Sequence, residues 1–93
     1  MTTSAFETAP RATAVAFSEN ELIVHLTDGR TIIVPLSWYP RLFTATSAQR
    51  AEYRLIADGE YIHWPQVDED LTVAGLLRGT PAPNAGRLTA LTS

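Results

Sequence analysis

Two Asp-Gly dipeptides, Asp28-Gly29 and Asp58-Gly59, each lie between runs of apolar residues in this 93-residue chain. A type I′ turn needs a positive φ at both of its central residues, and Asp-Gly meets that need better than almost any other pair. The sequence therefore predicts two β-hairpins, one in each half. A chain of this length provides one domain, so the two hairpins are expected to share a core.

The first hairpin takes its register from its turn. If Asp28-Gly29 is a two-residue loop, the chain pairs outward from it with a fixed partner for each residue. The predicted pairs are Leu26 with Thr31, Val24 with Ile33, and Leu22 with Pro35. The run that precedes this hairpin joins the same strand if Glu19-Asn20 is the intervening turn. This second turn pairs Phe17 with Leu22 and Val15 with Val24.

Both registers agree on one core face for these three strands, because residues two apart point to the same side of a sheet. The predicted core face is Val15, Phe17, Leu22, Val24, Leu26 and Ile33. The opposite face is Ala14, Ala16, Ile23, His25, Ile32 and Val34. It is too apolar for open solvent, and a partner, a second protomer or a tail could cover it.

The second hairpin is expected to place Arg54 opposite His63 and Leu55 opposite Ile62. Its core side is then Tyr53, Leu55, Ile62 and Trp64, and its other side is Arg54, Ile56, Tyr61 and His63. Pro65 ends this ladder, because proline cannot donate a main-chain hydrogen bond to it.

Helical signals lie between and after the hairpins. Pro40 suits a first helical turn, with Ser37 or Tyr39 at its entrance, and Thr46 with Gln49 forms a capping-box pattern. Leu42, Phe43 and Ala51 are expected to lie against the sheet. A last helix is expected from about Leu71 to Arg78, with Asp68 or Asp70 capping its start and Gly79 ending it.

The sequence thus predicts an α+β fold. It comprises an antiparallel β-meander plus a second β-hairpin in one sheet, one or two short helices in the middle and one short C-terminal helix. Residues 12–78 form the predicted compact domain. Residues 1–11 and the Gly-, Pro- and Thr-rich residues 79–93 are expected to be flexible N- and C-terminal tails.

Composition excludes several kinds of chemistry. The chain has no cysteine, and its seven basic residues are all arginine. Disulfides, thiol nucleophiles, Schiff-base lysines and Walker-type phosphate loops are therefore excluded. A net charge of −3 makes general nucleic-acid binding unfavourable. The chain shows no membrane span and no secretory signal, which favours a cytoplasmic location.

The densest group of reactive residues is the stretch HWPQVDEDL, from His63 to Leu71. We expect its carboxylates to serve the start of a helix, and its histidine to stay neutral beside Arg54. The only other histidine, His25, lies on a different hairpin, and no spaced metal-ligand pattern occurs. We therefore predict no catalytic residue, no metal and no cofactor.

Residues that often dominate protein interfaces occur near Pro40. Trp38, Tyr39 and Arg41 are of the types enriched at interface hot spots. Trp38 and Trp64 are expected to be buried or half-buried, which leaves Tyr39 and Arg41 as surface anchors. The full set of predicted partner-binding residues is Trp38, Tyr39, Arg41, Arg54, His63, Asp68, Glu69 and Asp70.

Three ordered segments, DGRTIIVPLSWYPRL, QRAEYRLI and IHWPQVDEDL, resemble the bacterial family catalogued as domain of unknown function 2442. The resemblance runs from about Val15 to Gly79, with Ser47 where the family usually has proline. It implies a small α+β domain with an antiparallel sheet and short helices. The family has no established activity and supplies no catalytic residue. Its members resemble stand-alone proteins or domains joined to helix-turn-helix regions, often the second gene of a toxin–antitoxin-like pair.

Three functions follow as hypotheses. The first is a non-enzymatic protein-interaction module, such as an antitoxin-like partner or regulator of a neighbouring gene product, or a module that self-associates through the second sheet face. The second is a binder or inhibitor of a nucleic-acid-handling complex. The third is a small hydrolase or metal-dependent enzyme centred on His63 and Asp68.

Overall fold

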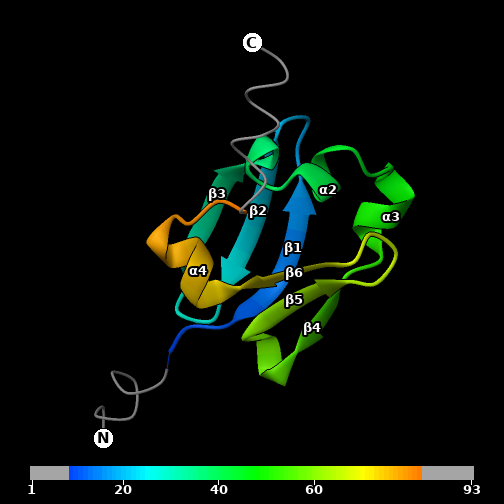
Figure 1. Ribbon diagram of the computed structural model, residues 1–93. Coiled ribbons are helices and arrows are strands. Elements are labelled where there is room, and N and C mark those ends of the chain that lie inside the picture. Colours follow the sequence, from blue (N-terminus) through cyan, green and yellow to red (C-terminus); the bar gives the residue numbers. More distant parts are fainter. Residues whose placement is uncertain (1–8, 83–93) are drawn as a thin grey trace, which may run out of the picture.

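A computed structural model describes residues 9–82 of the chain as two three-stranded antiparallel sheets with short helical segments (Figure 1). The first sheet contains β1 (Ala12–Phe17), β2 (Glu21–Leu26) and β3 (Thr31–Pro35), in that order. The second contains β4 (Arg54–Ile56), β5 (Tyr61–Trp64) and β6 (Glu69–Thr72). The α+β class is confirmed. The prediction of a single sheet is wrong, because β6 pairs with β5 and the second hairpin thus belongs to a separate sheet.

The helical segments are short and connect the strands. They are η1 (Leu36–Trp38), α2 (Pro40–Phe43), α3 (Ser47–Ala51), η2 (Ala57–Gly59) and α4 (Val73–Arg78). The segments η1, α2 and α3 carry the chain from the first sheet to the second. Within residues 9–82, no helix is long and apolar enough to cross a membrane.

The register of β1 on β2 agrees with the prediction. Phe17 pairs with Leu22 and Val15 with Val24. The Ser18 N–H donates to the Glu21 carbonyl at 3.0 Å, which closes the two-residue loop between the strands. The side chains of Leu22 and Val24 are fully buried, as expected for the core face of a central strand.

The register of β2 on β3 differs from the prediction by one residue. Leu22 pairs with Val34, and Val24 pairs with Ile32. The loop has three residues rather than two, because the Leu26 N–H bonds to the Arg30 carbonyl at 2.8 Å. A type I′ turn needs two residues with positive φ, and here Gly29 alone has one (93°).

This one-residue shift turns every side chain of β3 to the other face of the sheet. Val34 (6% exposed) and Ile32 face the core, whereas Ile33 is 56% exposed. The prediction had placed Ile33 in the core and the other two outside. Asp28 favours the longer loop, since its Oδ1 accepts the Arg30 N–H at 3.0 Å.

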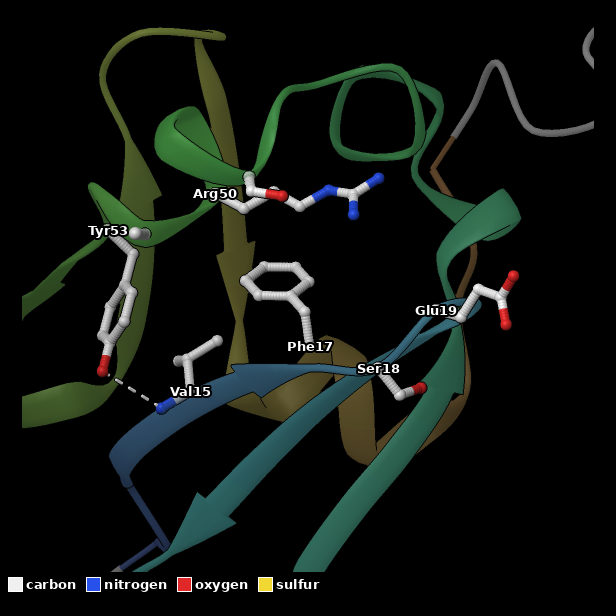
Figure 2. Close-up of a pocket in the computed structure, with 8 residues that line it drawn as sticks. Val15, Phe17, Ser18, Glu19, Arg50 and Tyr53 are labelled. Atoms are coloured by element: carbon white, nitrogen blue, oxygen red, sulfur yellow. Dashed lines mark hydrogen bonds between the residues drawn. The ribbon is translucent and has the colours of Figure 1, made fainter.

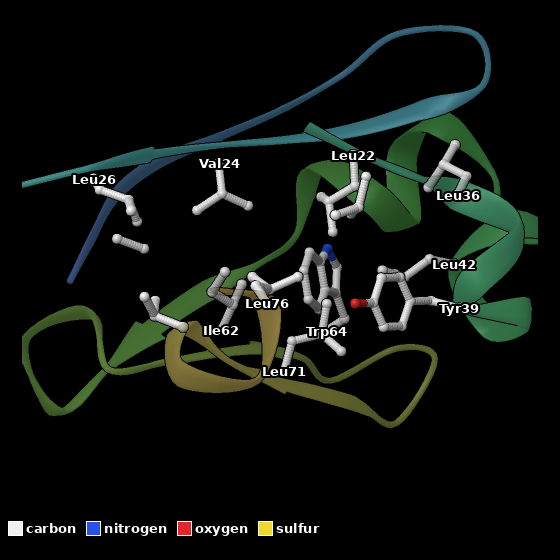
Figure 3. Packing of buried hydrophobic residues seen from close by; sticks show 13 residues of the cluster. Leu22, Val24, Leu26, Leu36, Tyr39, Leu42, Ile62, Trp64, Leu71 and Leu76 are labelled. Atoms are coloured by element: carbon white, nitrogen blue, oxygen red, sulfur yellow. The ribbon is translucent and has the colours of Figure 1, made fainter. Parts of the chain in front are cut away.

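The core lies between the two sheets (Figure 3). Side chains of β2 and side chains of β5 and β6 point toward one another across it, with Trp64 near its centre. The buried residues are Ala12, Leu22, Val24, Leu26, Val34, Leu36, Tyr39, Leu42, Ile62, Trp64, Leu71, Val73 and Leu76. The indole N–H of Trp64 donates to the Arg50 carbonyl at 3.0 Å, so its burial leaves no donor unpaired.

The register of the second hairpin is confirmed. Arg54 pairs with His63 and Leu55 with Ile62. Ile62 is fully buried as expected, but Leu55 remains partly exposed on β4, an edge strand. Three consecutive residues of the turn, Ala57–Gly59, have positive φ values. The turn thereby brings Gly59 against the backbone of Ala12.

The two middle helices begin as predicted. Pro40 starts α2, and Thr46 and Gln49 form the complete capping box of α3. Of the three residues expected against the sheet, Leu42 is buried, while Phe43 and Ala51 are exposed. Both helices last little more than one turn, so each buries less of its surface than the sequence pattern suggested.

The carboxylates of residues 68–70 do not cap the last helix as predicted, because Glu69 and Asp70 belong to β6. The helix α4 starts later and is capped by Thr72, whose side chain accepts the Gly75 N–H at 2.9 Å. Its end is as predicted: Gly79 is left-handed, and its N–H bonds to carbonyls of the last turn.

The predicted tails lie mostly outside the described residues, which exclude 1–8 and 83–93. The described part continues to make contacts beyond the predicted domain limits. The Arg11 N–H donates to the Thr27 hydroxyl at 3.1 Å, and the Ala82 N–H donates to the Trp38 carbonyl at 3.0 Å. Ala82 also packs against the core.

Replacing Gly59 by alanine is expected to destabilise the fold strongly. A Cβ there would lie 2.2 Å from the Ala12 carbonyl oxygen, and φ is 96°. Left-handed strain and overpacking together are expected to cost about 3 kcal/mol. Gly29→Ala is the control, since its φ is 93° but no atom lies within 4 Å of the added Cβ. Urea unfolding should show a loss of only about 1 kcal/mol for the control. Equal losses would contradict the close approach of Gly59 to Ala12.

The register of β3 predicts unequal effects for two neighbouring residues. Val34→Ala removes buried methyl groups and should lower the free energy of unfolding by about 1–2.5 kcal/mol. Ile33→Ala removes exposed ones and should change it by about 0.5 kcal/mol or less. Urea unfolding of both variants measures the difference. A larger loss of unfolding free energy for Ile33→Ala than for Val34→Ala would instead support the two-residue loop and its register.

Candidate functional site

The eight predicted partner-binding residues do not form one site. Arg54, His63 and Asp70 lie in one row across the outer face of the second sheet. The others lie around the connection from η1 to α2 and the turn before β6, where Arg41 meets Asp68.

Tyr39 is not the surface anchor that the sequence suggested. It is 2% exposed and packs in the core, where its hydroxyl donates to the Thr80 carbonyl at 3.4 Å. Burial, and next the negative charge of Glu69, raise the pKa of Tyr39 to about 12. Trp38 is half-buried, as predicted. The two aromatic residues therefore serve mainly to attach the helical connection to the core.

Arg41 is exposed, as predicted, but it is bound within the chain. Its Nη1 donates to the main-chain carbonyl of Asp68 at 2.6 Å and lies 4.0 Å from the Asp68 carboxylate. Asp68 itself has a φ of 55°. The arginine thus holds the turn between β5 and β6 in a left-handed conformation that a non-glycine residue rarely adopts.

Glu69 points to the core side of β6, where it is partly buried beside a small cleft of about 240 Å³ between β6, α4 and residues 80–82. Its pKa is raised, mainly by burial and also by the charges of Asp70 and Asp68, while Arg41 acts in the opposite direction. The position of Glu69 therefore destabilises the charged form of its carboxyl group.

His63 is hydrogen-bonded to Asp70, through Nδ1 and Oδ1 at 2.5 Å. The sequence had suggested Arg54 as the neighbour of this histidine, and Asp68 or Asp70 as the cap of a helix. The sequence of β6, EDLT, gives little signal for a strand, because the polar Glu69 shares the core side with the buried Leu71 and breaks the alternation of polar and apolar residues. The pair orients the imidazole ring, but among the described residues no nucleophile is hydrogen-bonded to it. Within residues 9–82, no group of three or more His, Cys, Asp or Glu residues could hold a metal.

The outer face of the first sheet carries an uncharged, apolar centre. Ala16, Ile23 and Ile33 form a row across the three strands, with Ile33 the most exposed. His25 and Thr31 follow on the next row, joined by a hydrogen bond of 3.1 Å between the imidazole and the hydroxyl. The prediction had included Ile32 and Val34 in this face, but both point to the core.

A groove of about 540 Å³ lies between β1 and α3 (Figure 2). Its lining residues are Val15, Phe17, Ser18, Glu19, Ser47, Arg50, Ala51 and Tyr53. The sequence gives no sign of this groove, because its two walls come from segments about thirty residues apart. No local pattern marks such a site, since it exists only where β1 and α3 are brought together by the core.

Comparison with known proteins gives relatives without a described activity. Residues 12–82 match the family described as "Protein of unknown function (DUF2442)". A protein of unknown function from Rhodospirillum rubrum is similar in structure (TM-score 0.71, 28% identity), over 84% of this chain and 96% of that one. An uncharacterized protein from Chromobacterium violaceum has a TM-score of 0.69 at 20% identity, over 89% and 79% of the two chains. No curated protein matches the chain.

Replacing Glu69 by glutamine is expected to stabilise the protein at pH 7 by up to about 0.5 kcal/mol, because it removes a charge from a partly buried position. Since the folded-state pKa is raised, the cost of the charge is present above that pKa and disappears as the pH falls toward the ordinary value of 4.5. Urea unfolding at several pH values should show the difference between variant and parent shrinking on acidification. Glu52→Gln, at an exposed position, is the control. A less stable variant at pH 7 would mean that attraction by Arg41 outweighs burial.

Proposed function

Because the chain belongs to the DUF2442 family, whose function is unknown, we propose from its own surface that it is a non-enzymatic protein-interaction module. Its partner is another protein, such as the product of a neighbouring gene that it regulates or neutralises in the manner of an antitoxin. The proposal places this interaction in the bacterial cytoplasm, consistent with the bacterial sources of both similar structures.

The observation that carries the proposal is the exposure of Ile33 at the centre of the outer face of the first sheet. Its side chain is 56% exposed and stands beside Ile23 and Ala16, with no charged residue in that row. Covering Ile33 with a partner would gain about 1 kcal/mol from its apolar surface alone. The small side chain of Ala16 leaves room for a partner to approach the sheet closely.

The outer face of the first sheet is by itself too small for a stable interface. Three strands of this length present roughly 300 Å² on one face, from their spacing and rise per residue. A stable interface buries about 800 Å² on each partner. A pair of copies joined through this face alone falls well short, so a partner must also extend over the neighbouring edges and loops.

Ile33→Asp is expected to abolish partner binding while leaving the fold intact, because the residue is exposed and a carboxylate is costly in an apolar interface. The tagged full-length chain would be expressed in its native host together with the adjacent gene, cross-linked, and its captured proteins quantified by mass spectrometry. A true partner should fall about tenfold or more with the variant.

Ala74→Asp is the matched control, because it adds the same charge at an exposed position of α4. Circular dichroism and the midpoint of thermal unfolding would establish that both variants fold. Equal capture by the parent chain and Ile33→Asp would contradict a role for this face. A chain that captures nothing in its native host would contradict the interaction module itself.

A further inference from the structure

The outer edge of β1 is unpaired where it borders the groove. The Val15 N–H points away from β2 and donates to the Tyr53 hydroxyl at 3.2 Å (Figure 2). Main-chain groups of an antiparallel strand alternate between its two sides, so the N–H and C=O of Phe17 point to that same edge. The inward bond from the Ser18 N–H to Glu21 agrees with this alternation. Within residues 9–82, no loop or side chain bonds to the Phe17 main chain.

The two sheets are close together at one end of β1 and diverge along it. At Ala12 the strand touches Gly59 of the second hairpin, and at Val15 the Tyr53 hydroxyl bridges the gap. At Phe17 the side chain still packs against Trp64, 6.2 Å between ring centres, but within residues 9–82 no hydrogen bond joins the strand edge to the second sheet, and the groove opens. An extended chain segment is the structure that fills such a gap, because it can supply both a donor and an acceptor to a strand edge.

The groove is apolar at one end and cationic at the other. Val15 and Tyr53 lie at the first end, whereas the Arg50 guanidinium lies 5.6 Å from the centre of the Phe17 ring, toward the second end, where Glu19 also lies (Figure 2). Ala51 also lines the groove. Figure 2 shows this guanidinium extending over Phe17 and away from Tyr53. An occupant therefore needs an apolar group and an anionic group, separated along the edge of β1.

Arg50 is held in place but retains donors for a ligand. Its Nε and one Nη donate to the carbonyls of Leu42 and Phe43, both at 2.9 Å. A guanidinium has five N–H groups, so these two bonds leave others free. No carboxylate within residues 9–82 forms an ion pair with it. A carboxylate from a partner would meet a cation that is already fixed, which reduces the entropy cost of binding.

The geometry points to this groove as the docking site for an extended segment of the partner protein, which adds a short strand to β1. The segment pairs its main chain with Phe17 and inserts an apolar side chain between Val15, Ala51 and Tyr53. Two residues along, an aspartate or glutamate meets Arg50. That spacing follows because side chains two apart in a strand share a face and lie about 6.8 Å apart.

This inference rests on the proposed function and gives it a second contact surface with a stated chemistry. Glu19 at the rim adds a limit, because its carboxylate would repel a segment with several acidic residues in a row. The preferred segment therefore carries one carboxylate in an otherwise uncharged, apolar strand.

The test is a selection of phage-displayed random heptapeptides on the full-length chain. Enriched sequences are expected to contain an apolar residue two positions from an aspartate or glutamate. One enriched peptide, synthesised with a fluorescent label, would be titrated by polarisation. Changing its acidic residue to the amide should weaken binding about tenfold, because the bond to Arg50 loses its charge. Hydrogen exchange of the Phe17 amide should slow when the peptide binds.

Ala51→Trp should abolish peptide binding by filling the groove, whereas Ala48→Trp, exposed on the same helix but outside the lining, should not. Failure to enrich any such motif, or peptide binding that survives Ala51→Trp, would overturn the inference. Peptide binding that Ile33→Asp abolishes and Ala51→Trp does not would also overturn this inference. That result would still support the proposed interaction module. A dimer of the free chain that Ala51→Trp dissociates would identify a second copy as the occupant and likewise overturn it.

Discussion

The burial of Trp64 between the two sheets is the interaction on which the other features of this protein depend. Its ring belongs to β5, lies 6.2 Å from the ring of Phe17 on β1 and 6.4 Å from that of Tyr53, and bonds through its N–H to the Arg50 carbonyl. One side chain thus joins both sheets and α3. Because it fixes Arg50 and Phe17 relative to each other, it also shapes the groove between them.

The two proposed surfaces lie on the same sheet but differ in chemistry. The outer face around Ile33 offers apolar area without polar groups, which favours association but gives little selectivity. The groove beside Phe17 offers unpaired main-chain groups and one fixed cation, which select for an extended segment with a matching carboxylate. A partner that contacted both surfaces would bury more area than either surface provides. The groove would then make up for the small area of the sheet face.

Several predictions that depended on neighbours in sequence succeeded, but the register of β3 and the cap of the last helix did not, and the surface position of Tyr39 failed because it depends on distant segments. The capping box at Thr46, the left-handed Gly79 and the hairpin pair of Leu55 with Ile62 all follow from local turn chemistry, and all were confirmed. The register of β3 failed because an Asp-Gly pair fits more than one hairpin loop, and the shift by one residue reverses the strand. Tyr39 was assigned to the surface because its pattern cannot show that η1 folds back over the core.

The amino-acid sequence by itself determined the fold class, the two hairpins, several helix ends and the absence of thiol and lysine chemistry, since composition, turns and caps act within a few residues. Only the tertiary structure decided which face of β3 is buried, that Asp70 meets His63, and that β1 and α3 enclose a groove. These features depend on which side of each strand the core covers. The packing of the two sheets around Trp64 decides which side is covered. Each strand must pair its main chain with its neighbours and also bury its apolar side chains in the core.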